Sequence, residues 1–196
     1  MEHLKKITHA VWQARQRISF GESAQWNGNC FLQSWVNSVS PGAWDNSPGW
    51  YWIESDISAV ELSGIALPTS IAPKAIKFSE IARENLERFD RSDLCESRGC
   101  SVIYNGQEKR VFTRLRTHYS LTAHNSATGA LAIGSYPLSA RQWTASYFHK
   151  GMISKLSTLA TADKEMLSTK INAKYYRELV EMCWRMEFGW PILSKK

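Results

Sequence analysis

Two tyrosines, an arginine and a histidine follow one another in an order that suits phosphodiester chemistry. Tyr51 closes a Gly-Trp-Tyr triplet, and Tyr104 opens a Tyr-Asn-Gly triplet. Arg114 and His118 follow, and because they are four positions apart, a helix would present both side chains on one face. A guanidinium can neutralise charge on a phosphoryl oxygen, and a phenol or an imidazole can relay the proton of an attacking water. The four residues together predict a nuclease site.

Each of these residues also has a commoner structural role. Tyrosines in apolar strands are usually core residues whose hydroxyl makes one hydrogen bond. An arginine and a histidine on one helix face are usually solvated. The conjunction of all four in a fixed order is what favours a catalytic role over these structural ones.

The elements that must position these residues can be read from the local patterns. The segment 49–55 is apolar and follows turn-forming Ser-Pro pairs, which predicts a strand. The run 102–107 is apolar and contains a glycine, which predicts a second strand. Helical spacing begins at Val111. Tyr104 would therefore lie near a strand end, with Arg114 and His118 on the helix that follows.

These motifs resemble those of the GIY-YIG endonuclease superfamily. The resemblance covers residues 49–55 and 100–120 well and residues 176–194 loosely. It implies an α+β module: a small, three-stranded, mainly antiparallel sheet flanked by helices. Trp50 and Asn105 stand in the middle of the triplets, where aliphatic residues are common in the family. The motifs are about fifty residues apart, so the two paired strands would be separated by an insertion.

The resemblance also implies a catalytic role for Tyr51 and for Arg114, with Tyr104 and His118 as supporting residues. Tyr51 would be the general base, and Arg114 would stabilise the charged transition state. The pKa of a free phenol is about 10, so Tyr51 would need neighbouring groups that stabilise its ionised form. A hydrogen bond to Tyr104 or His118, and the field of nearby cations, would lower its pKa.

A glutamate on a later helix would hold the metal ion, Mg²⁺ or Mn²⁺. The segment 174–188 predicts this helix, and Glu181 fits the family pattern better than Glu178. By this resemblance the expected metal ligand is Glu181, with Glu178 as the alternative. The apolar stripe expected to be buried consists of Tyr175, Leu179, Met182, Cys183 and Met186. Alternatively, both glutamates are ordinary helix carboxylates, Glu178 paired with Lys174 and Glu181 with Arg177 or Arg185. Ser194 stands where the family usually has asparagine.

The length of 196 residues favours a single domain. We expect an N-terminal extension over 1–48, an insertion over 56–99, and a nuclease core over 49–55 and 100–194. An amphipathic helix is predicted from about Leu4 to Ile18. A helix capped by Ser79 is predicted in the insertion, and two short strands are predicted at 130–133 and 142–148. Four of the tryptophans precede the first motif strand and are expected in the core or a dimer interface: Trp12, Trp26, Trp35 and Trp44.

Composition is consistent with a nucleic-acid partner. The formal net charge is +6, which suits a polyanion. The four cysteines do not have zinc-ligand spacing, and free thiols are expected. No apolar stretch has the length of a membrane span, so we expect a cytoplasmic protein.

The small size favours a type II restriction endonuclease within the family. Such an enzyme would cut double-stranded DNA at a short, palindromic site as a homodimer, with a cognate DNA methyltransferase encoded nearby. Candidate DNA-binding residues are Arg110, Arg116, His124, Asn125, Arg141, Gln142 and Lys150. The alternatives are a repair or mobile-element nuclease, and a basic DNA-binding protein without catalytic activity.

Overall fold

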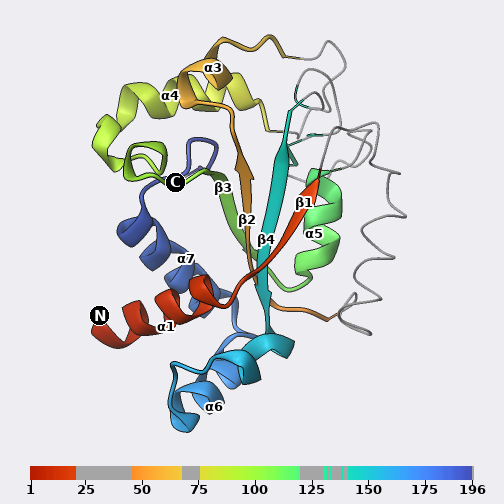
Figure 1. The fold of residues 1–196 in the computed structure, drawn as a ribbon, viewed down its shortest axis with the longest axis vertical. Helices are drawn as coiled ribbons and strands as arrows, with labels where there is room; N and C mark the ends of the chain where they lie inside the picture. Colours follow the sequence, from red (N-terminus) through yellow and green to blue (C-terminus); the bar gives the residue numbers. More distant parts are fainter. Residues whose placement is uncertain are drawn as a thin grey trace.

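An antiparallel sheet with helices on both of its faces defines the architecture (Figure 1). The computed structural model describes residues 1–20, 46–67, 76–119, 130–131, 133, 138 and 141–195. The protein belongs to the α+β class, as the sequence predicted. The predicted residues His124 and Asn125, and Trp26, Trp35 and Trp44, lie outside the described residues.

The described residues form a four-stranded sheet in the order β1-β4-β2-β3, with every neighbouring pair antiparallel. Its strands are β1 (Gln16–Phe20), β2 (Gly49–Ser55), β3 (Val102–Glu108) and β4 (Trp143–His149). The expectation of three strands is wrong, because the N-terminal segment adds β1 beside β4. Of the two strands predicted after the site helix, the second is β4. Residues 130, 131 and 133 are not in a strand.

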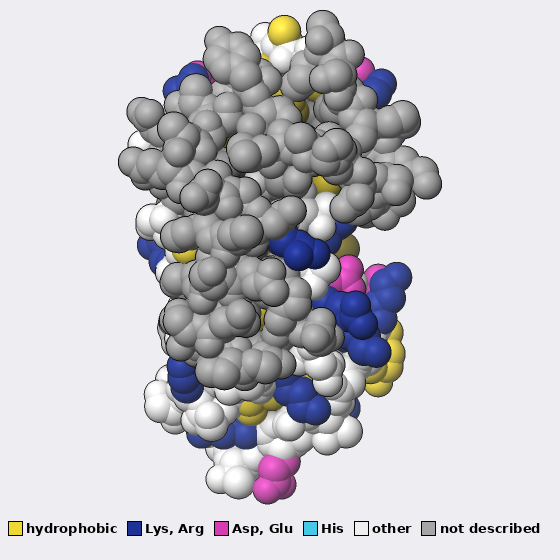
Figure 2. All heavy atoms as spheres, turned by 90° about the vertical axis from the view of Figure 1, so that its right-hand side faces the viewer, with side chains coloured by type: hydrophobic (Ala, Val, Ile, Leu, Met, Phe, Trp, Pro, Cys, Tyr) yellow, Lys and Arg dark blue, Asp and Glu magenta, His cyan; other side chains and the backbone are white. Residues whose placement is uncertain are grey.

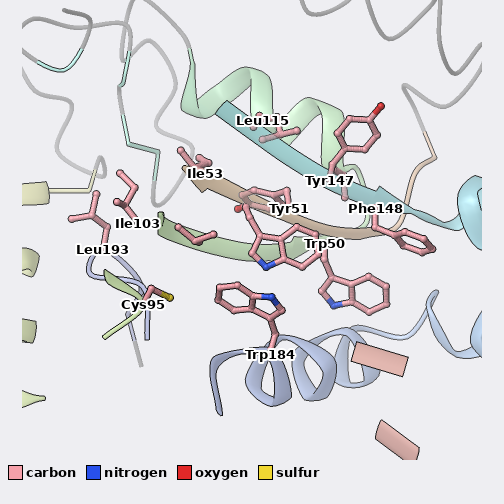
Figure 3. Packing of buried hydrophobic residues seen from close by; sticks show 14 of the residues in the cluster. Trp50, Tyr51, Ile53, Cys95, Ile103, Leu115, Tyr147, Phe148, Trp184 and Leu193 are labelled. Carbon is pink, nitrogen blue, oxygen red and sulfur yellow. The ribbon is translucent and has the colours of Figure 1, made fainter. Parts of the chain in front are cut away.

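The two motif strands pair directly, with β2 also bonded to β4 on its other side. All seven residues of β2 are buried, as expected for a central strand covered on both faces. Successive side chains point to opposite faces. Trp50 donates from its indole nitrogen to the Arg177 carbonyl (2.8 Å), whereas Tyr51 contacts His118 on the other face. The two motif strands thus divide their side chains between two helical layers (Figure 3).

The described helices cover both faces of the sheet (Figure 1). The α-helices are α1 (Glu2–Gln13), α3 (Ala59–Gly64), α4 (Phe78–Arg88), α5 (Val111–His118), α6 (Thr161–Lys170) and α7 (Lys174–Phe188). Short 3-10 helices are η2 (Arg91–Asp93), η3 (Glu96–Arg98) and η5 (Lys150–Lys155). Trp12 of α1 packs edge-on against Trp52 and Trp184, which joins α1, β2 and α7 in one aromatic cluster.

Two predictions about helix ends are wrong. The first helix was expected to run to Ile18, but α1 ends at Gln13, and Ile18 lies in β1 paired with Ala145. Ser79 was expected to cap the insertion helix, but Lys77 occupies the N-cap position of α4, and Ser79 is buried in the first turn.

The bounds predicted for α7 are confirmed, but its predicted buried stripe is wrong. Of that stripe only Cys183 is buried; the other four side chains are exposed, namely Tyr175, Leu179, Met182 and Met186. The face that packs on the sheet consists of Tyr176, Arg177, Val180, Cys183, Trp184 and Arg185. No helix of the described part of the chain is long and apolar enough to span a membrane.

Candidate active site

Tyr51 and His118 meet in the protein interior between β2 and α5. The Tyr51 hydroxyl lies 3.1 Å from His118 Nε2, and the two side chains are almost fully buried. The Tyr104 ring packs against the same imidazole, with ring centroids 5.0 Å apart. The structure therefore brings the two motif tyrosines and the helix histidine into one cluster.

The tautomer of His118 follows from its second hydrogen bond. The backbone N–H of Leu131 donates to His118 Nδ1 at 3.2 Å. Burial, with a smaller contribution from the charge of Arg114, holds the pKa of His118 well below its usual value, so the ring is neutral at pH 7. A neutral ring that accepts at Nδ1 carries its proton on Nε2. His118 consequently donates a hydrogen bond to the Tyr51 oxygen.

Arg114 lies one helical turn before His118 and hydrogen-bonds both tyrosines. Burial alone would lower the pKa of Arg114, but the interactions with Tyr51 and Tyr104 outweigh it and raise that pKa. The Tyr51 oxygen thus faces two donors, a guanidinium and an imidazole N–H. Donors of this kind stabilise a phenolate more than a phenol.

Burial nevertheless decides the ionisation of Tyr51. It raises the pKa of Tyr51 well above the usual value, and Tyr104 and Glu181 add to the increase, while Arg114 opposes it. The expectation that its neighbours would bring the pKa of Tyr51 below the usual value is wrong for the protein alone. Arg114 acts in the expected direction, but removal from water is the larger effect.

Gly106 of the second motif lies opposite Tyr51 in the β2–β3 ladder. The Tyr51 ring covers the position that a side chain at residue 106 would occupy. The glycine of the Tyr-Asn-Gly triplet therefore gives Tyr51 the space to reach His118 and Arg114.

Glu181 belongs to α7, the helix on the opposite face of the sheet from α5, and its charge makes the smallest of the contributions that shift the pKa of Tyr51. Its side chain is 15% exposed and forms an ion pair with Arg185. Burial raises the pKa of Glu181 to about 7; Arg185 opposes this effect and Glu178 adds to it. Glu178 has a 52% exposed side chain and pairs with Lys174 at 3.3 Å. Both ion pairs foreseen for ordinary helix carboxylates therefore form, although only Glu181 is largely buried.

Three residues outside the predicted site hold Glu181 in place. Arg185 bonds Glu181 with one guanidinium nitrogen and donates from Nε to Asn105 Oδ1 at 2.9 Å. Ser194 donates to the same Asn105 oxygen at 3.0 Å and accepts the backbone N–H of Asn105 at 3.2 Å. The middle residue of the second motif is thus a bridge between the C-terminal segment and the buried carboxylate. In the sequence, the four-residue spacing of Glu181 and Arg185 indicated their ion pair, whereas the hydrogen bonds that join Asn105 to Arg185 and Ser194 had no local signal.

The donor set is compatible with a magnesium ion that keeps most of its water ligands. Among the described residues, no group of three or more His, Cys, Asp or Glu side chains could hold a metal ion. Mg²⁺ is commonly bound through one or two carboxylates, with waters and substrate phosphate oxygens as the remaining ligands. Glu181 fits that pattern as the single protein carboxylate.

The residues predicted to contact DNA are spread over the molecule. Arg110 is the N-cap residue of α5, and Arg116 lies in the last turn of this helix. Arg141 forms an ion pair with Glu61 of α3, and Lys150 Nζ lies 3.4 Å from Asn172 Oδ1. Gln142 is exposed, and its backbone carbonyl accepts a hydrogen bond from Ser55. Among the described side chains on the face seen in Figure 2, Lys and Arg are more prominent than Asp and Glu.

Comparisons with known proteins yield no match. No protein-family model matches the sequence, and neither a curated protein nor a solved structure is similar to it.

Proposed function

We propose that this protein is a metal-dependent DNA endonuclease of the GIY-YIG kind. The observation that carries the proposal is the position of the Tyr51 oxygen between two donors, Arg114 and the Nε2–H of His118. A tyrosine that serves only the core needs one hydrogen-bond partner. Two donors, one of them cationic, create a position suited to negative charge.

Each residue has a defined task in this proposal. Tyr51 accepts the proton of the attacking water, and His118 and Arg114 stabilise the phenolate that precedes this step. Arg114, shared between Tyr51 and Tyr104, is also placed to neutralise a phosphoryl oxygen. Arg185 and Asn105 fix the orientation of Glu181, the residue that would hold Mg²⁺ or Mn²⁺. When bound, that ion supplies electrostatic stabilisation of the charge that develops on the leaving oxygen.

The raised pKa of Tyr51 in the protein alone fits a site that becomes active only with substrate. Burial is the main cause of the raised pKa of Tyr51, and Tyr104 and Glu181 add to it; a divalent cation beside Glu181 would cancel the contribution of that carboxylate. The same cation would favour the ionised form of Glu181, whose pKa is about 7 without it. Proton abstraction by Tyr51 would thus depend on metal and DNA.

Within this class we propose a type II restriction endonuclease, which cuts a short palindromic site in double-stranded DNA. The basic charge of the chain and the arginines of α5 support a DNA substrate. A DNA methyltransferase encoded beside this protein would support restriction over repair.

The decisive test is incubation of the purified protein with unmethylated phage DNA and Mg²⁺, beside an EDTA control and the Glu181→Gln variant. Discrete fragments that require Mg²⁺ and Glu181 would establish a sequence-specific endonuclease. A smear would indicate a nonspecific or structure-directed nuclease. Intact DNA whose mobility shifts would contradict the enzyme and favour a basic DNA-binding protein.

A further inference from the structure

Four large apolar side chains lie in one stripe on the outer face of α7. They are Tyr175, Leu179, Met182 and Met186, whose exposed fractions are 62%, 50%, 42% and 59%. Their spacing of four, three and four residues places them in a row along the helix. Elsewhere in the described residues the large exposed hydrophobic side chains are Met1 and Val60. Such a concentration on one face marks an interaction surface.

The spacing of the stripe is symmetric along the helix. The midpoint of the outer pair, Tyr175 and Met186, falls between positions 180 and 181 of the helix. The inner pair, Leu179 and Met182, has the same midpoint. A two-fold axis perpendicular to α7 at this midpoint would lay the helix antiparallel against its own copy. Leu179 would then face Met182 of the other copy, and Tyr175 would face Met186. A surface that matches itself in this way favours a second copy of this chain over an unrelated partner.

A cavity of about 300 Å³ lies at one end of the stripe. It is lined by Met186, Phe89 and Trp190 and by three charged residues, Asp93, Arg98 and Arg185. The Phe89 and Trp190 rings stack with centroids 5.0 Å apart. In the antiparallel arrangement the Tyr175 ring of the other copy would lie beside this cavity. Each copy thus offers a tyrosine at one end of the stripe and, at the other, a hollow lined by aromatic and charged side chains.

The exposed area is large enough for the core of a dimer interface. The four side chains together expose roughly 400 Å² of mostly apolar surface, within the range of the largest patches on monomers. A standard interface buries about 800 Å² per partner. The stripe supplies about half of this area, and the rims of the cavity and of α7 add to it.

We propose that α7 forms a two-fold, antiparallel dimer interface with α7 of a second copy through this stripe. The proposal does not depend on nuclease activity. A two-fold axis in this position leaves a given flank of α7 facing the same direction in both copies. The flank that carries Glu178 and Glu181 therefore lies on one side of the dimer in both copies. If Glu181 belongs to a nuclease site, the two sites of the dimer are accessible from one direction.

The oligomeric state of the full-length chain tests the interface. Light scattering coupled to size-exclusion chromatography should give twice the chain mass of 22.3 kDa for the wild type. Leu179→Arg and Met182→Arg should each give a single chain mass, because each places a charge opposite the same apolar stripe. Val60→Arg is the matched control, since Val60 is 55% exposed on α3, and it should remain dimeric.

Circular dichroism keeps the test independent of misfolding. Leu179 and Met182 are exposed on the helix of one chain, so arginine there should leave the helical signal unchanged. A wild-type protein that is monomeric at tens of micromolar would overturn the proposal. A dimer that persists in both folded stripe variants would overturn it as well, because another surface would then hold the copies together.

Cross-linking tests the antiparallel register. Tyr175→Cys and Met186→Cys chains, carrying tags of different size, are mixed and oxidised. The mixture should give a covalent heterodimer, whereas Tyr175→Cys alone should give no more dimer than oxidised wild type. Residues 175 of the two copies would be about 16 Å apart along the helix, well beyond the reach of a disulfide. Efficient cross-linking of Tyr175→Cys to itself would indicate a parallel arrangement and overturn the register.

Discussion

The Tyr51 ring occupies the space that a side chain on Gly106 would need. A Cβ atom added to Gly106 would lie 2.5 Å from Tyr51 Oη and 2.7 Å from Cζ, well inside van der Waals contact. The two residues are direct partners in the β2–β3 ladder, one from each motif triplet. The glycine of one motif and the tyrosine of the other are therefore a single structural unit.

Gly106→Ala should displace the Tyr51 ring from His118 and Arg114. We expect a loss of about 1–3 kcal/mol in unfolding free energy, typical of overpacking, together with loss of DNA cleavage. Urea denaturation and the cleavage assay measure the two effects. Gly64→Ala is the control, because a Cβ there meets no atom within 4 Å. An alanine at 106 that leaves both stability and cleavage unchanged would contradict this account.

Tyr51→Phe should reduce the cleavage rate by a factor of about 10²–10⁴, the usual contribution of a general base. It should also cost about 1–3 kcal/mol of stability, because the Nε2–H of His118 loses its buried acceptor. Tyr147→Phe is the matched control on β4. Tyr147 pairs with Tyr51 in the β2–β4 ladder, but its hydroxyl donates to Gln16 of β1 at 2.5 Å, in the edge strand opposite β3. Equal cleavage by both variants would exclude Tyr51 as the base.

Glu181 should make the protein less stable as the pH rises from about 5 to about 8. Its pKa is about 7 in the folded protein against an ordinary 4.5, so the folded state binds the proton more tightly. The resulting stabilisation is fully present below 4.5 and is lost as the pH rises through about 7. The full shift corresponds to about 3 kcal/mol.

Glu181→Gln should remove this part of the pH dependence. The difference in unfolding free energy between wild type and variant, measured in urea at pH 5, 6, 7 and 8, isolates the contribution of this carboxyl from other titrations. Glu178→Gln, on an exposed residue of the same helix, should give a curve parallel to the wild type. A Glu181→Gln curve that is also parallel would show that burial does not raise the pKa of Glu181.

Ser194→Ala should destabilise the protein by about 1–3 kcal/mol, because it leaves the buried N–H of Asn105 without an acceptor. It should also raise the Mg²⁺ concentration needed for half-maximal cleavage, since Asn105 positions Arg185 and hence Glu181. Ser157→Ala, at an exposed position, is the control. Loss of stability with unchanged Mg²⁺ dependence would limit Ser194 to a structural role.

The local patterns predicted the elements that hold the site but not the contacts within it. The bounds of β2 and α7 follow from turn residues and from apolar spacing, and both are confirmed. The tautomer of His118, in contrast, depends on the backbone N–H of Leu131, and no side-chain motif indicates such a contact.

The buried face of α7 could not be read from hydrophobic periodicity, because apolar residues occur on both sides of the helix. Tyr176, Val180 and Trp184 compete with the stripe that includes Leu179. Arg177 settles the choice in the folded protein: its guanidinium is buried and donates to Gln107 of β3 at 2.8 Å. An arginine that packs against a strand counts as polar in any periodicity analysis, and the predicted face is therefore displaced.

Strand β1 had no local signal for its partner. Ile18 pairs with Ala145, more than a hundred residues later, so the segment could equally continue the preceding helix in a sequence-based prediction. Long-range pairing decides its structure.

The strand order has a consequence for synthesis of the chain on the ribosome. Both β1 and β2 pair with β4, which is made after them, and α7 with Glu181 follows later still. Domains fold as units while synthesis proceeds from the N-terminus. The sheet cannot be completed before residue 149 has emerged, and Glu181 is added only after α7 has emerged. Nascent chains and prematurely terminated products therefore lack the assembled site, so any cutting activity would be confined to finished molecules.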